Sequence, residues 1–198
     1  MQRVLDQFLE NLTRVRLLGG LHASLTSTTT AVLDVSDLLR AQIVLAISAF
    51  DTLVHELTRL GMLEAAAGKR TVVDTFQRFQ VSFESVQLSA GASTLDWLDA
   101  EIRRKHSFLS FQTPDKVADA IRLISSVSLW NSVGSHLGKS PTDIKKELQL
   151  IVDRRNKIAH EADGDPSFPG TRWPIDPIMV NRAIDFLEAV GKAIFLSV

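Results

Sequence analysis

The stretch that most constrains the fold of this chain is residues 41–50, which read AQIVLAISAF. When this stretch is wound as a helix, apolar side chains cover nearly all of its sides. A helix of that kind is stable only where other helices or a partner subunit surround it. We expect the helix to begin after Ser36 as its N-cap and to run to about Leu60, with Gly61 as its stop signal. The sequence therefore predicts a long central helix.

Helical periodicity dominates the rest of the 198 residues as well. Residues 2–18 carry an apolar stripe that we expect to end at Gly19-Gly20, before a Ser/Thr-rich loop over residues 24–30. The other expected helices are short ones over 70–84 and 95–106, and those that begin where a capping residue precedes proline, at Thr113-Pro114, Ser140-Pro141 and Asp176-Pro177. Residues 161–176 are expected to form a Gly/Pro-rich loop. Since no segment alternates as a buried strand does, the prediction is an all-α bundle of about six to eight helices in one domain, residues 1–198.

The composition limits the kinds of site that the chain can build. No cysteine is present, and no spacing of histidines and acids predicts a metal site or a cofactor. The N-terminus is charged throughout, and the apolar run Ala41–Val54 is too short to span a bilayer, so we expect a cytoplasmic protein without a membrane segment. The net charge is −1, so any binding of RNA must depend on local basic clusters. The candidate clusters, each of which is by itself more simply a solvated helix face, are Arg103-Arg104-Lys105, Lys145-Lys146 and Arg154-Arg155-Lys157.

The segment from Asp143 to His160, DIKKELQLIVDRRNKIAH, predicts an amphipathic helix with a cation inside its apolar arc. This cation is Arg155, and a buried guanidinium is costly unless a partner or a wet cleft receives it. Asn156 and His160 are four residues apart and share a neighbouring strip, at the edge between core and surface. A purely structural interpretation stays open, in which Arg155 pairs with a core carboxylate and His160 caps the last helical carbonyls.

The run Arg155-Asn156-Lys157-Ile158-Ala159-His160 resembles the signature of the HEPN superfamily, in which a polar residue follows arginine and histidine comes a few positions later. Residues 48–57, SAFDTLVHEL, are similar to the long helix of the RiboL-PSP-HEPN branch, so the resemblance extends over the whole helical plan. Arg16 and His22 have a similar spacing. Because Gly19-Gly20 is expected to separate these two residues into different segments, we interpret them as a chance match.

The resemblance implies a metal-independent endoribonuclease, a toxin or defence effector that cleaves RNA as a homodimer with one shared cleft. His160 would act as general base and acid on the ribose 2′-hydroxyl, and Arg155 would hold the phosphate charge with its bidentate grip. Asn156 would orient the histidine or the phosphate. The resemblance also implies an antitoxin or a defence-system partner. HEPN toxins that pair with nucleotidyltransferase antitoxins carry a tyrosine two residues after the histidine, but this position is Ala162 here and the chain contains no tyrosine, so that route of regulation is excluded.

Further residues could support the motif. The supporting residues that we expect are Asp51, His55, Glu56 and Arg154, and the expected RNA-binding lysines are Lys145, Lys146 and Lys157. In the functional interpretation Asp51 or Glu56 pairs with Arg155, and in the structural one a buried Asp–His pair holds helices together. Two alternatives to an enzyme stay open. One is a non-catalytic HEPN module that binds RNA or a nucleotide, or mediates dimerisation and partner recruitment, and the other is a helical scaffold in which the motif is structural.

Overall fold

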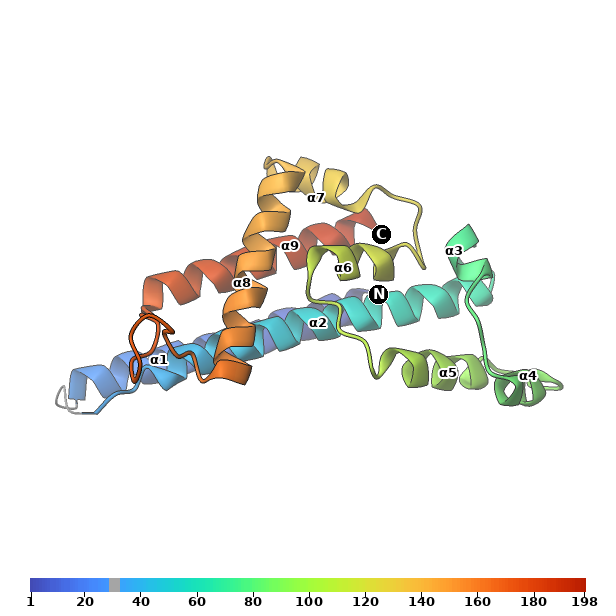
Figure 1. Cartoon of the computed structure of the whole chain (residues 1–198). Coiled ribbons are helices and arrows are strands. Elements are labelled where there is room, and N and C mark those ends of the chain that lie inside the picture. Colours follow the sequence, from blue (N-terminus) through green and yellow to red (C-terminus); the bar gives the residue numbers. More distant parts are fainter. Residues whose placement is uncertain (29–32) are drawn as a thin grey trace.

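The computed structural model describes residues 1–28 and 33–198, and apart from one isolated bridge between Gly164 and Arg172 the regular structure of these residues is helical (Figure 1). The nine helices among them are α1 (Gln2–Thr28), α2 (Asp37–Ala66), α3 (Asp74–Gln77), α4 (Phe83–Ser89), α5 (Asp96–His106), α6 (Pro114–Ile121), α7 (Leu129–Leu137), α8 (Pro141–Glu161) and α9 (Pro177–Ser197). The all-α prediction is confirmed. There are more helices than expected because the predicted helix over 70–84 is divided into α3 and α4, and no sequence signal marked α7.

Helix α2 lies at the centre of the bundle (Figure 1). Helix α1 packs along it, and α9, α8, α6 and α5 contact it as well. Phe50, Leu53 and Leu57 are at most 1% exposed, and burial of a side chain of this size contributes roughly 1.5–3 kcal/mol. Gln42 is buried too, and its Nε2 donates to the carbonyl of Val15 in α1 at 3.1 Å. The predicted central helix is therefore present, and its buried amide has a partner.

Helix α2 is also the one helix among the described residues whose length and apolar composition would suit a membrane span. In its most apolar window of 18 residues, 56% of the residues are buried inside the protein. Its apolar surface is thus largely covered by the neighbouring helices, as expected for the core helix of a bundle.

Two glycine positions that we expected to end helices lie inside them instead. Helix α1 continues through Gly19-Gly20, and a Cβ on Gly19 would lie 3.0 Å from Nε2 of Gln42. Helix α2 continues through Gly61, where a Cβ would lie 2.6 Å from Cγ2 of Ile124. Gly19 and Gly61 therefore allow neighbouring side chains to approach the helix closely, and the predicted helix ends are wrong.

The longer α1 changes two further expectations. Residues 24–28 of the predicted loop are helical, while residues 29–30 lie outside the described residues. Arg16 and His22 lie in one helix, so the prediction that Gly19-Gly20 separates them into different segments is wrong. Arg16 instead joins α1 to α9, because its Nη2 pairs with Asp185 at 2.7 Å and with Glu188 at 2.8 Å.

The predicted N-caps are present at two of the four positions. The hydroxyl of Ser140 and the carboxylate of Asp176 each accept a backbone N–H of the first helical turn, at 3.1 and 2.9 Å. The side chains of Ser36 and Thr113 make no such bond. Ser36 has a helical backbone conformation, and its hydroxyl accepts a hydrogen bond from Arg40 at 2.7 Å instead.

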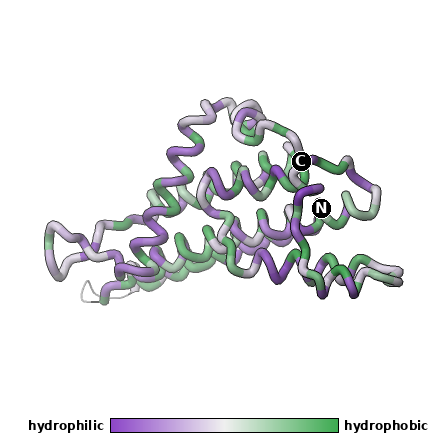
Figure 2. Tube along the Cα trace, turned by 45° about the vertical axis from the view of Figure 1, so that its right-hand side comes forward, coloured by the Kyte–Doolittle hydropathy of each residue, from purple (hydrophilic) through white to green (hydrophobic). Residues whose placement is uncertain are grey.

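Helix α8 crosses α2, and the loop that follows α8 returns along the bundle to the start of α9 (Figure 1). Ile144, Leu148 and Val152 are at most 1% exposed and anchor α8 in the core. Residues 153–162 are all half-buried or exposed. In Figure 2 most of α8 has hydrophilic colours, and it is the most hydrophilic of the four long helices. The last turns of α8 therefore present mostly polar side chains, while Ile158 still packs against the core.

Candidate functional site

The C-terminal end of α8 brings the three motif residues to the surface. Arg155 is half-buried, and its Nη1 donates to Oδ1 of Asn156 at 2.9 Å. His160 is exposed and lies one turn beyond Asn156 on the same face. Within the described residues the side chain of His160 takes part in no hydrogen bond or ion pair, so it does not cap the helical carbonyls. An accessible imidazole can exchange a proton with a bound ligand.

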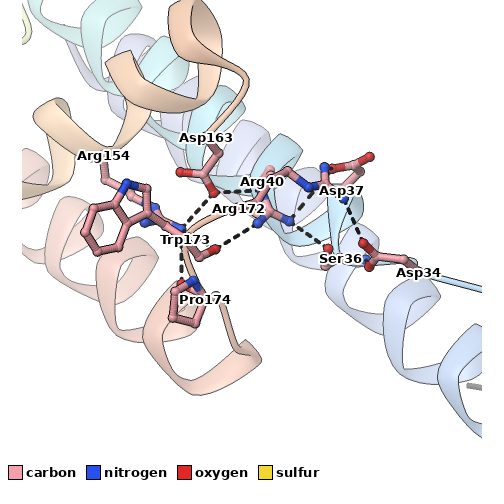
Figure 3. A network of polar contacts seen from close by, with 9 residues as sticks. All are labelled: Asp34, Ser36, Asp37, Arg40, Arg154, Asp163, Arg172, Trp173 and Pro174. Carbon is pink, nitrogen blue, oxygen red and sulfur yellow. Dashed lines mark hydrogen bonds and ion pairs between the residues drawn. The ribbon is translucent and has the colours of Figure 1, made fainter. Parts of the chain in front are cut away.

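The buried ion pair of this region belongs to Arg154, the neighbour of the motif arginine (Figure 3). Its Nη2 donates to Oδ2 of Asp163 at 2.8 Å, and to the carbonyls of Trp173 and Pro174 at 3.2 and 3.1 Å. The same oxygen of Asp163 accepts from Nε of Arg40 at 2.7 Å. Asp163 is 0% exposed and Arg40 is 6% exposed. Guanidinium groups from α2 and α8 thus share one buried carboxylate, which joins both helices to the loop after α8.

The positive charge of Arg154 is less stable in this network than the charge of an arginine in water. Burial lowers the pKa of the Arg154 guanidinium from its ordinary value, and the positive charge of Arg40 acts in the same direction, while Asp163 opposes both. Two cations therefore share one buried carboxylate, and Arg40 has a second, exposed carboxylate partner in Asp37 at 3.8 Å. Removal of that carboxylate would leave both guanidinium groups without their buried counter-charge.

The turn that follows α8 has an unfavourable backbone. Ala162 and Asp163 have φ values of 52° and 58°, in the left-handed region, where each non-glycine residue costs roughly 1–3 kcal/mol. The N–H of Asp163 donates to the carbonyl of Lys157 at 3.0 Å, and its carbonyl accepts from the N–H of Trp173 at 2.9 Å. Such a conformation persists only where its surroundings hold it. Here the side chain and the backbone of Asp163 both do so.

The expected supporting acids have other partners. Asp51 accepts a hydrogen bond from the backbone N–H of Phe111 at 2.6 Å, and Glu56 pairs with Arg59 at 2.7 Å. The Nε of Arg155 is buried and has no hydrogen-bond partner among the described residues. Neither interpretation of Arg155 therefore holds among the described residues: it pairs neither with Asp51 or Glu56, as in the functional one, nor with a core carboxylate, as in the structural one.

Asp51, His55 and Glu56 instead line a separate cavity of about 400 Å³ between α2, α5 and the turn after α5. Nε2 of His55 lies 3.6 Å from Oδ1 of Asp51, and the His55 ring lies 4.3 Å from the ring of Phe111, centroid to centroid. His106 is 5% exposed, and burial, together with the nearby charge of His55, lowers its pKa to about 4. This cluster holds the segment after α5 against α2 through the hydrogen bonds of Asp51 to Phe111 and Gln112. Asp51 and His55 are half-buried rather than buried as the structural interpretation had them.

The three lysines that were expected to bind RNA do not form one cluster. Lys145 and Lys146 lie in the first turns of α8, about 15 Å along the helix axis from Asn156. Nζ of Lys157 lies 5.0 Å from the centroid of the Trp173 ring, in a cation–π contact. Only Lys157 therefore lies beside the motif, and its ammonium group already contacts an aromatic ring.

A groove of about 490 Å³ lies beside the motif, between the N-terminal half of α2 and the end of α8. Its lining residues, five apolar and three charged, are Ala41, Val44, Leu45, Ile158, Ala162, Asp37, Arg40 and Arg172. Leu45 is 46% exposed there. Within the described part of the chain, no three histidine or acidic side chains come together in a way that could hold a metal ion. The groups that this region offers for chemistry are therefore an imidazole, guanidinium groups and an amide.

Comparison with known families matches nearly the whole chain. The model of the RiboL-PSP-HEPN family matches residues 9–198, which include both α2 and the motif helix α8. The chain belongs to the RiboL-PSP-HEPN family. The resemblance that rested on Arg155–His160 and on residues 48–57 is thereby confirmed at the level of the family. Comparisons with curated proteins and with solved structures found no match.

Two residues of this HEPN domain that organise the end of α8 were not identified from the sequence. Arg40 could have been identified from the sequence, because an arginine that begins a largely apolar helix needs a buried partner. Asp163 could not, since it lies in a polar loop in which Asp165 has similar surroundings in sequence. Only the folded chain distinguishes the two, by placing Asp163 between two guanidinium groups.

Proposed function

We propose that this RiboL-PSP-HEPN protein is an endoribonuclease in which His160 and Arg155 carry out the reaction. The observation that carries the proposal is the placement of exposed His160 and of Asn156 on one face at the end of α8, with the guanidinium of Arg155 hydrogen-bonded to Asn156. Membership of the HEPN family supports the same assignment. Asn156 orients the guanidinium through the hydrogen bond that its amide oxygen accepts.

In the proposed reaction the imidazole of His160 removes the proton of a ribose 2′-hydroxyl. The 2′-oxygen then forms a bond to the adjacent phosphorus, and the bond between phosphorus and the 5′-oxygen breaks. A protonated imidazole returns the proton to the leaving 5′-oxygen, which yields a 2′,3′-cyclic phosphate and a 5′-hydroxyl. Arg155 stabilises the charge that develops on the phosphate oxygens. Since side chains supply both the proton transfer and the charge stabilisation, the proposed cleavage is metal-independent.

The proposed active form is a two-fold symmetric homodimer in which the ends of two α8 helices form one cleft. Apolar surface near this end supports the proposal, because Leu45 in the groove is 46% exposed and Leu150 on α8 is 60% exposed. The second copy of His160 would then act as the acid while the first acts as the base. We further propose a toxin or defence effector that cleaves cellular or phage RNA and is restrained by an antitoxin or defence-system partner.

The proposal is tested by incubating the purified protein with single-stranded RNA in EDTA, alongside the same oligonucleotide made of deoxyribose. We expect cleavage of the RNA, with 2′,3′-cyclic phosphate ends, and an intact deoxyribose strand. Activity that appears only with added Mg²⁺ or Mn²⁺, or cleavage of the deoxyribose strand, would contradict the mechanism. Tight binding of RNA without cleavage would favour the non-catalytic HEPN module.

A further inference from the structure

We infer that Asp163 is a positioning residue for His160, because its buried carboxylate holds the strained turn that ends α8 in place. This inference rests on the proposed function, since His160 is the group whose position matters. Asp163 is buried and does not contact the substrate. It acts through the backbone between residues 160 and 163 and through the two arginines that it joins.

The carboxylate of Asp163 ties the end of α8 to the start of α2. Its Oδ2 accepts from Nε of Arg40 on α2 at 2.7 Å and from Nη2 of Arg154 on α8 at 2.8 Å (Figure 3). The side chain is 0% exposed, so water cannot replace either bond. Arg40 also donates from Nη2 to the carbonyl of Trp173 at 2.9 Å, which brings the returning loop into the same network. Three separate segments are therefore fixed relative to one another at a point three residues after His160.

The backbone angles of the turn after α8 are unfavourable, so the ion pairs of Asp163 hold this turn in a strained conformation. Ala162 and Asp163 both have positive φ values, 52° and 58°, directly after the last turn of α8. Without the buried ion pairs, the turn would relax toward ordinary backbone angles. His160 would move with it, because it lies in the final turn and its side chain makes no hydrogen bond or ion pair among the described residues.

Loss of this positioning should reduce the rate of the chemical step rather than substrate binding. A misplacement of a reacting group by about 1 Å can cost on the order of 100-fold in rate. Phosphate contacts made by Arg155 and by neighbouring cations do not depend on the direction of the imidazole. We therefore expect a fall in kcat of about 10- to 100-fold, with KM changed by much less.

The test compares Asp163→Asn, Arg154→Met and Arg154→Lys with the control Arg16→Met. Arg16 also joins two helices through carboxylates, α1 to α9, and neither carboxylate belongs to the Asp163 network, so its replacement reports the effect of a broken inter-helix ion pair alone. For each variant, kcat and KM for RNA cleavage are measured at a temperature at which circular dichroism shows a folded protein. The NMR signal of the His160 ring, one of five histidines, is recorded on the same preparations and assigned with His160→Ala.

We expect Asp163→Asn to lower kcat and to shift or broaden the His160 signal, and Arg154→Met to do the same to a smaller extent. Arg154→Lys should recover part of the rate, because an ammonium group offers three donors to the same acceptors. Arg16→Met should leave both readouts unchanged. A folded Asp163→Asn variant with normal kcat and an unmoved His160 signal would overturn the inference. If Asp163→Asn does not fold, the same result for Arg154→Met would overturn it.

The two proposals fail in distinguishable ways. If the unmodified protein does not cleave RNA, the proposed function is wrong, while the NMR comparison still decides whether Asp163 positions His160. If the protein cleaves RNA and neither kcat nor the His160 signal responds to the Asp163 and Arg154 variants, the function stands and the positioning role is wrong.

Discussion

Replacing Arg154 by alanine should destabilise the protein far more than replacing the adjacent Arg155. Nη2 of Arg154 donates to the buried carboxylate of Asp163 at 2.8 Å and to two carbonyls at 3.1 and 3.2 Å. A hydrogen bond to a charged group contributes roughly 1.5–3 kcal/mol, and Asp163 would retain Arg40, so we expect a loss of about 3 kcal/mol. For a chain of this length the melting temperature should fall by about 6–12 °C.

Arg155 should behave differently because, among the described residues, its side chain donates to Asn156 alone, which is a neutral side chain of the same helix. We expect its replacement by alanine to cost about 1 kcal/mol or less. The two free energies of unfolding are measured in urea, at one fixed protein concentration because a dimer would make them concentration-dependent. Equal decreases in the free energy of unfolding for the two variants, or a larger decrease for Arg155→Ala, would refute the assignment of the buried ion pair to Arg154.

Two further predictions concern assembly and pH. Light scattering should report a dimer at micromolar concentration, because apolar surface at Leu45 and Leu150 is exposed near the motif, and a monomer would contradict the shared cleft. Burial, aided by the charge of His55, lowers the pKa of His106 to about 4 from 6.5, so between these pH values the unfolded chain binds a proton that the folded chain does not. Stability should therefore fall by up to roughly 3 kcal/mol as pH drops through this window. Urea unfolding of His106→Leu should lack that loss, and an identical pH slope in both proteins would contradict the account.

The fold class could be predicted from the sequence because it depends on the periodicity of apolar residues. A helix that is apolar on nearly all sides needs a bundle around it, and α2 has one. The glycines at 19 and 61 were misjudged because local sequence does not distinguish a helix end from a close contact. Gly61 faces Ile124, which is 63 positions later in the chain, and this separation leaves no local signal.

The placement of Arg155, Asn156 and His160 at the end of one helix could be predicted from the sequence, because spacing within a helix determines the face. Their surroundings could not, because these come from distant segments. The buried partner of the basic run proved to belong to Arg154 rather than to Arg155, and this difference depends on how α8 is rotated against α2 and the loop after it. The structural interpretation placed a core carboxylate against Arg155, whereas the buried carboxylate is Asp163 in the loop and pairs with Arg154. Asp51 and Glu56 on α2 have other partners.

The most direct test of the central claim measures RNA cleavage and thermal melting on the same preparation of His160→Ala. His160 is exposed, and its side chain makes no hydrogen bond or ion pair among the described residues, so its truncation should leave the melting temperature unchanged. Loss of a general acid–base group should reduce cleavage by about 10²- to 10⁴-fold. We therefore predict that His160→Ala has an unchanged melting temperature and no longer cleaves RNA. Full cleavage by His160→Ala would contradict the assignment of the nuclease activity to this motif.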